Sequence, residues 1–139
     1  DTEMEDRIAA HKTQRGAGWD TVEEPLNLCG ALARTDGAGA RLVDCMTLWL
    51  SNVMHAELDW QAELEKVLQR LREQSTPVVL VTNEVGGGIV PMSALARRYR
   101  DASGLMNQRL GARAGHVVLV TCGLPLALKG SAAAPASLA

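Results

Sequence analysis

The chain has 139 residues, which is enough for one domain with a single hydrophobic core. Its 14 Lys and Arg stand against 16 Asp and Glu, and this balance argues against a nucleic-acid-binding protein. Three widely spaced cysteines argue against a disulfide framework or a zinc site. The N-terminus is too polar for a signal peptide, and no apolar run is long enough to span a bilayer. We therefore expect a cytoplasmic protein.

The first predicted element is a helix over residues 2–14. Acidic residues crowd its first turn and Lys12 lies near its end, the distribution that the helix dipole favours. His11 falls on or beside the apolar face of this helix, and periodicity alone favours an ordinary residue of a solvated helix end over a catalytic one. A glycine-rich loop at 16–18 ends the helix.

The next predicted element is a strand that begins at Leu42, after a segment over 24–40 that gives no strong prediction apart from a loop at 35–40. Asp44 lies near the C-terminal end of this strand, and two interpretations stay open. A carboxylate there suits a ligand site, because open α/β sheets bind ligands beyond the carboxyl ends of their strands. An edge strand with Asp44 facing water is equally compatible with the pattern.

Residues 59–74 give the clearest helix prediction. Asp59 is a suitable N-cap, and the apolar positions recur with helical spacing. They form one stripe, made of Trp60, Leu64, Val67, Leu68 and Leu71. Such a stripe is explained more simply by core packing than by an interaction surface. Trp49 and Trp60 would face either the core or a partner.

The second half of the chain alternates strand and helix patterns. The run VVLVT at 78–82 predicts a strand covered on both faces, and a glycine-rich turn follows it at 86–88. A helix is predicted over 93–114, weakened by Gly104, and VVLVT recurs at 117–121 as a third strand. The alternation predicts an α/β fold with a mostly parallel sheet and helices on both faces.

Four segments, in this order, carry a resemblance to a known family: EMEDRIAAHKTQRGAGWDTVEEP, LVDCMTLWLSN, VVLVTNEVGGGIVPMSALARRYRDASGLMNQRL and GLPLALKG. The most specific parts are R-I-x-x-H-K-x-x-R-x-x-x-W and TNEVGGGIVP with the A-R-R-Y-R-D and N-Q-R-L elements that follow. Together they resemble the bifunctional adenosylcobinamide kinase/adenosylcobinamide-phosphate guanylyltransferases over almost all of residues 2–130.

The resemblance implies a RecA-like P-loop fold and two reactions of cobalamin nucleotide-loop assembly. The first phosphorylates adenosylcobinamide with ATP or GTP. The second transfers GMP from GTP to adenosylcobinamide phosphate through a covalent guanylyl-histidine, and the matching histidine here is His11. The family also implies Mg²⁺ and a homotrimer.

The resemblance further implies a set of nucleotide-binding residues: Lys12, Thr13, Gln14, Arg15, Glu23 and Asp44. The chemistry is suitable, because a neutral imidazole is a nucleophile near pH 7 and cations stabilise the charge that develops on phosphate oxygens. Asp44 also corresponds to a magnesium-holding acid of P-loop proteins. Glu23 would accept hydrogen bonds from a ribose or from a guanine edge, and the residue type does not choose between them.

The family's phosphate loop, with its Lys and Ser on the first strand, has no counterpart in this sequence, and the chain begins with Asp1 instead of Met. We therefore expect residues 1–130 to form a partial nucleotide-binding domain that lacks the first strand and binds nucleotide poorly alone. A disordered tail of small residues is expected at 131–139. Two alternatives are a non-catalytic nucleotide- or corrinoid-binding fragment and a kinase without guanylyl transfer.

Overall fold

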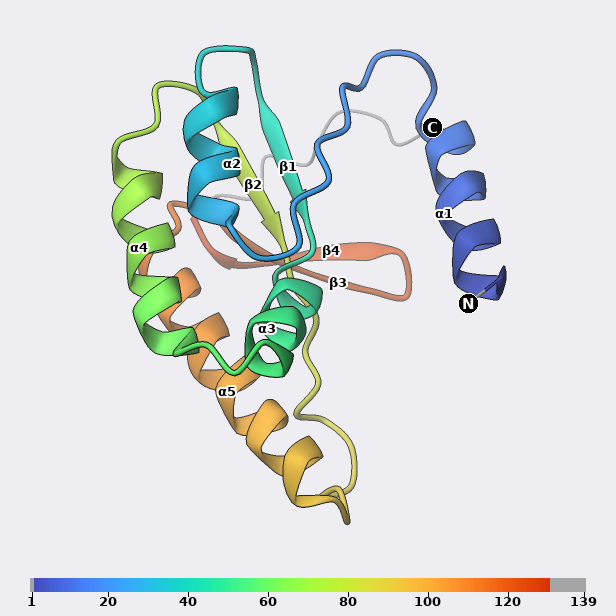
Figure 1. The fold of residues 1–139 in the computed structure, drawn as a ribbon, viewed down its shortest axis with the longest axis vertical. Helices are drawn as coiled ribbons and strands as arrows, with labels where there is room; N and C mark the ends of the chain where they lie inside the picture. Colours follow the sequence, from blue (N-terminus) through green and yellow to red (C-terminus); the bar gives the residue numbers. More distant parts are fainter. Residues whose placement is uncertain (1, 131–139) are drawn as a thin grey trace.

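The computed structural model describes residues 2–130 as five helices and four strands (Figure 1). The helices are α1 (Thr2–Arg15), α2 (Leu28–Thr35), α3 (Met46–His55), α4 (Trp60–Arg72) and α5 (Ala94–Arg113). The strands are β1 (Arg41–Asp44), β2 (Val78–Val81), β3 (Val117–Thr121) and β4 (Leu124–Lys129). The tail expected at 131–139 lies outside the described residues.

The three helix predictions are confirmed as α1, α4 and α5. Asp59 caps α4 as expected, because its carboxylate accepts hydrogen bonds from the backbone N–H groups of Gln61 and Ala62 at 3.0 and 3.2 Å. The hydroxyl of Ser93 caps α5 in the same way. Gly104 does not interrupt α5, since packing of the buried face compensates for its low helix propensity.

Two further helices were not predicted. In α2, Asn27 is the N-cap and its side chain accepts a hydrogen bond from the N–H of Gly30 at 2.9 Å. In α3, the helix starts at Met46 directly after β1, without a side-chain cap. The nearly continuous apolar run across this junction hides the change of period, so sequence periodicity did not locate the start of α3.

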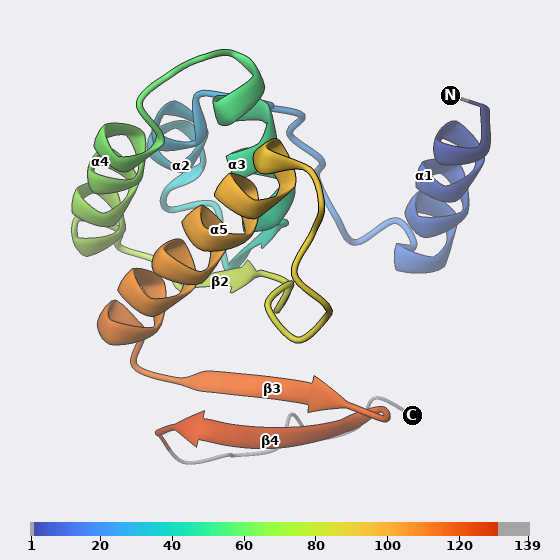
Figure 2. The same ribbon diagram turned by 90° about the horizontal axis from the view of Figure 1, so that it is seen from below.

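The sheet prediction is only partly correct, because β1 and β2 alone form a parallel pair, in which Leu42 is opposite Val79 and Asp44 is opposite Val81. Figure 2 shows α2, α3, α4 and α5 on the same side of this pair. On the other side, the side chains of Leu42 and Val79 are 37% and 56% exposed. Helices on both faces, and a β2 strand covered on both faces, were therefore wrong for the described residues. A β-branched run reports strand propensity and does not report what covers each face.

The third predicted strand exists as β3 but does not join β1 and β2. It pairs antiparallel with β4, which was not predicted. Cys122 and Gly123 connect the two strands with positive φ angles of 52° and 73°, as the tight two-residue hairpin turn requires. Pro125 lies inside β4, and a proline weakens any strand prediction because it cannot donate to the ladder.

The hydrophobic core lies between the helices and the covered face of β1 and β2. Trp49 is only 5% exposed and its indole N–H donates to the carbonyl of Leu26 at 2.9 Å, while Trp60 packs against the same core, so both tryptophans face inward. The buried members are Leu28, Leu32, Met46, Trp49, Leu50, Val53, Leu64, Val67, Leu68, Ala102, Met106 and Leu110.

Asp36 joins the end of α2 to the loop before β2. Its carboxylate accepts hydrogen bonds from the backbone N–H groups of Ser75 and Thr76 at 3.0 and 3.2 Å, and from the guanidinium of Arg41 at 2.9 Å. The hydrogen bonds from Ser75 and Thr76, led by the backbone N–H of Ser75, lower the pKa of Asp36 from 3.8 to about 2.

Replacement of Asp36 by asparagine should lower the melting temperature at pH 7, because the charge that these donors favour is removed. A folded-state pKa below the unfolded value stabilises the protein fully above about pH 4, and this contribution is lost as the pH falls toward 2. The melting temperatures of wild type and Asp36→Asn should therefore converge between pH 4 and 2, as measured by circular dichroism. Asp101→Asn, an exposed change on α5, is the matched control. A constant difference across this pH range would contradict the assignment.

Candidate functional site

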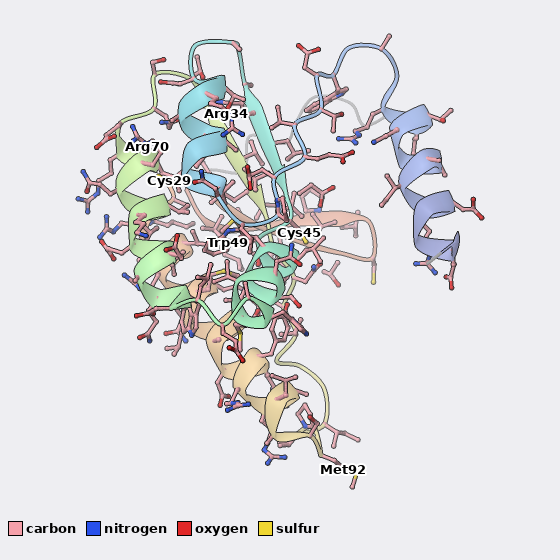
Figure 3. All side chains as sticks on the ribbon, viewed as in Figure 1. Cys29, Arg34, Cys45, Trp49, Arg70 and Met92 are labelled. Carbon is pink, nitrogen blue, oxygen red and sulfur yellow. The ribbon has the colours of Figure 1, made fainter. Side chains whose placement is uncertain are left out.

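The carboxyl ends of β1 and β2 meet at one edge of the parallel pair, and polar side chains gather there. Asp44, the last residue of β1, is exposed at this edge. Figure 3 shows Cys45 at the junction between β1 and α3. The structure therefore agrees with both interpretations of Asp44: it faces water, and it lies where α/β sheets bind ligands.

Thr47, a buried residue in the first turn of α3, is the centre of a partly buried hydrogen-bond cluster. Its hydroxyl accepts from the side-chain amide of Asn83 at 2.7 Å and lies 3.1 Å from the sulfur of Cys45. The hydroxyl of Tyr99 donates to the carbonyl of Thr47 at 2.9 Å. Burial raises the pKa of Tyr99, so this phenol remains a donor at neutral pH. The cluster holds the strand ends and α5 together.

Asn107 on α5 binds the segment that follows β2. Its amide oxygen accepts from the hydroxyl of Thr82 at 2.7 Å, and its amide nitrogen donates to the carbonyl of Asn83 at 3.2 Å and to Oε1 of Glu84 at 2.9 Å. Sequence reasoning assigned no role to these residues, although they lie within the TNEVGGGIVP and N-Q-R-L motifs. Only the fold shows that residues 25 positions apart share one site.

The glycine-rich turn predicted at 86–88 is present and continues into an exposed apolar loop. Arg100 donates to the carbonyl of Gly86, and Arg97 donates to the carbonyl of Met92 at 2.6 Å. Met92 is 98% exposed and marks the tip of this loop in Figure 3. A Cβ atom at any of the three glycines would meet nothing within 4 Å, so packing among the described residues does not require glycine there.

Predicted nucleotide-binding residues at the end of α1 form a second group. The ammonium group of Lys12 lies 2.8 Å from Oε1 of Glu23, and this hydrogen bond lowers the pKa of Glu23. The hydroxyl of Thr13 donates to the carbonyl of Ala9 within the helix. Gln14 and Arg15 complete the last turn of α1. The structure thus joins Lys12 with Glu23 through an exposed ion pair.

The two groups are not brought together in the structure. Both ribbon views show α1, the helix of His11, standing away from the carboxyl ends of β1 and β2 (Figures 1 and 2). Ile8 on this helix is 48% exposed, so it is not packed into the core. Residues 16–24 form an extended connection to the body of the protein.

The connection is anchored to α3 at its far end. The indole of Trp49 donates to the carbonyl of Leu26, and the side-chain amide of Asn52 donates to the carbonyl of Pro25 at 3.2 Å. Because only Cys45 separates Asp44 from α3, the anchor lies on the element that begins at the polar edge.

The predicted site residues do not line the surface hollow between α2 and α4. An open hollow of about 620 Å³ lies between α2 and α4 and is lined by Cys29, Lys66 and Arg70, among others. Among the side chains that the structure describes, no three His, Cys, Asp or Glu groups converge as a metal site, and no described helix combines the length and hydrophobicity needed to cross a membrane.

Comparison with known proteins gives a consistent result. The model of a family described as cobinamide kinase / cobinamide phosphate guanyltransferase matches residues 1–128. The bifunctional adenosylcobalamin biosynthesis protein CobP of Pseudomonas aeruginosa is 43% identical over 135 residues, which cover 94% of this chain and 77% of the relative. The CobU proteins of Escherichia coli and Salmonella typhimurium are 36% and 38% identical, and each alignment covers 93% of this chain and 80% of the relative.

Proposed function

The chain belongs to the cobinamide kinase / cobinamide phosphate guanyltransferase family, and we propose that it takes part in both reactions, phosphorylation of adenosylcobinamide and transfer of GMP to the product. The observation that carries the proposal is the family match over residues 1–128 together with 36% to 43% identity to bifunctional relatives. ATP and GTP are the proposed phosphate donors, and the cytoplasm is the proposed compartment.

We propose His11 as the nucleophile of guanylyl transfer. An imidazole nitrogen attacks the α-phosphorus of GTP, the bond from that phosphorus to the bridging oxygen breaks, and pyrophosphate leaves. An oxygen of adenosylcobinamide phosphate then attacks the same phosphorus and breaks the phosphorus–nitrogen bond. Lys12 and Arg15 follow His11 on one helix end, where their charges offset those of the phosphate groups.

This role requires α1 to approach the strand ends. The connection between Arg15 and the anchored Pro25 contains nine residues, 16–24, and an extended chain reaches about 3.3 to 3.6 Å per residue. His11 therefore has a reach of roughly 30 Å from the anchor on α3. The proposal is that bound nucleotide closes this distance, with Thr13, Gln14 and Glu23 contributing to the nucleotide site.

Magnesium fits the polar edge. Mg²⁺ bound with a nucleotide usually takes one or two carboxylates and fills its other positions with phosphate oxygens and water. Asp44 is an exposed carboxylate at a strand end and meets this requirement without a cluster of further acids. When bound, the ion offsets charge on the triphosphate, and Asp44 is the residue that would hold it.

We also propose that the domain is of the RecA-like P-loop type and works with a phosphate loop outside this sequence. The uncovered side chains of Leu42 and Val79 support a further layer on that face, and the hairpin exposes Val120, Leu124 and Leu128 at 60% to 68%. The same apolar surface is compatible with the proposed homotrimer. A protein that included the loop should bind GTP more tightly than residues 1–139 alone, as measured by calorimetry.

Intact-protein mass spectrometry after incubation with GTP and Mg²⁺ tests the proposal. The samples are residues 1–139 and a version extended upstream to the phosphate loop. A GMP-sized, acid-labile adduct on the extended protein is the expected result, with transfer to adenosylcobinamide phosphate when the acceptor is added. Phosphorylation of adenosylcobinamide without a GMP adduct would indicate that the protein is a kinase only. Nucleotide binding without either reaction would indicate a non-catalytic binding module. An adduct on residues 1–139 alone would show that the phosphate loop is dispensable.

A further inference from the structure

Glu84 is the second carboxylate at the edge that carries Asp44. Val81 is the register partner of Asp44, and Glu84 lies three residues beyond it, within roughly 10 Å along the chain. Its side chain is exposed, yet one oxygen, Oε1, accepts a hydrogen bond from Asn107. An exposed carboxylate on a loop is normally free to rotate, so this contact fixes its direction.

Asn107 uses its whole amide group on this segment. Its oxygen accepts from Thr82 and its nitrogen donates to both Asn83 and Glu84, so a single side chain forms hydrogen bonds with three consecutive residues. The side chain of Asn83 is held on the other side by Thr47, next to the end of β1. The segment is thus hydrogen-bonded to both α5 and α3.

We propose that Glu84 is the base of the kinase reaction and that Asn107 is the residue that positions it. This inference rests on the proposed function. In the kinase step the terminal hydroxyl of adenosylcobinamide attacks the γ-phosphorus, the bond between that phosphorus and the β,γ-bridging oxygen breaks, and the nucleoside diphosphate leaves. The hydroxyl proton passes to the Glu84 carboxylate and is later released to water. With Oε1 engaged by Asn107, Oε2 is the oxygen that receives the proton.

The other carboxylates of the candidate site suit this role less well. Glu23 is paired with Lys12, which lowers its pKa and makes it a weaker base. Asp44 is the proposed holder of magnesium, and a carboxylate bound to a dication is a poor proton acceptor. Among the residues described, Glu84 is neither paired with Lys12 nor the proposed holder of magnesium. It also precedes the exposed glycine-rich loop, where a large acceptor can approach the backbone.

Glu84→Gln in the extended protein tests the proposal, because it keeps the shape and removes the base. The kcat of adenosylcobinamide phosphorylation should fall by about 10² to 10⁴-fold, with little change in KM for the acceptor. Formation of the GMP adduct from GTP alone should be unchanged, since that step involves no acceptor hydroxyl. Glu63→Gln, on the distant helix α4, is the matched control and should retain full kinase activity.

Asn107→Asp tests the positioning role. The substitution keeps an acceptor for the Thr82 hydroxyl but loses the amide donor to Glu84, and it should lower kinase kcat by at least about tenfold while the GMP adduct still forms. In a Glu84→Gln background the same substitution should cause little further loss, because the two residues act through one base. Thr82→Val, which removes the other end of the contact, should have the smaller effect.

The outcomes separate this inference from the proposed function. Normal kinase kcat in Glu84→Gln would overturn the assignment of the base, and additive losses in the double variant would overturn the positioning role. Equal loss of kinase activity and GMP adduct, with unchanged melting temperature, would show that Glu84 serves nucleotide binding instead. Absence of both reactions in the extended wild type would overturn the proposed function itself.

Discussion

Replacement of His11 by alanine is expected to abolish the GMP adduct in the extended protein. Without the imidazole, nothing accepts GMP from GTP, and guanylyl transfer should fall by about 10⁴ to 10⁶-fold, the scale seen when a covalent enzyme loses its nucleophile. Phosphorylation of adenosylcobinamide should continue, because it needs no covalent intermediate on the protein. Intact-protein mass spectrometry measures the adduct, and a coupled assay measures the kinase.

The matched control for this experiment is His55→Gln. His55 lies at the end of α3, where its Nδ1 atom is 2.7 Å from the carbonyl of Ser51. Its substitution should not affect formation of the GMP adduct. Loss of the adduct in acid, as expected for a phosphorus–nitrogen bond, would distinguish it from a phosphate ester on Ser or Thr. An adduct that persisted in His11→Ala would place the nucleophile elsewhere and return His11 to a structural role on α1.

The second large expected effect is a fall in the free energy of unfolding when Leu50 is replaced by alanine. Leu50 on α3 is completely buried, and truncation to alanine leaves a cavity among the core residues of α3, α4 and α5. Such Leu→Ala changes cost about 2 to 5 kcal/mol, a large fraction of the roughly 5 to 15 kcal/mol that stabilises a domain. Urea denaturation followed by circular dichroism should show a lower midpoint, with the slope little changed.

Leu48 provides the control on the same helix, because its side chain is 60% exposed. Leu48→Ala makes the same chemical change and should alter the free energy of unfolding by less than about 0.5 kcal/mol. Equal destabilisation by both variants would contradict the orientation of α3, and with it the placement of the strand end that carries Asp44. The comparison therefore tests the fold on which the candidate site depends.

The sequence by itself determined the features that arise from local chemistry. Asp59 and Ser93 cap the helices α4 and α5 because their oxygen atoms accept from backbone N–H groups a few residues away. The apolar stripe around Leu64 and Leu68 is buried, because helical spacing places these side chains on one face. The four motif segments also sufficed for the family, since residue types and spacing alone define such a match.

Only the tertiary structure decided how distant segments combine. It separated β3 from the parallel pair and placed it in a hairpin with β4, which strand propensity cannot predict because propensity does not encode partners. It joined Asn107 to Thr82 and Glu84, and Lys12 to Glu23, across long stretches of chain. It also set α1 apart from the parallel pair of β1 and β2. Contacts of this kind depend on how helices and strands pack in space, and packing is a property of the whole fold and not of any local pattern.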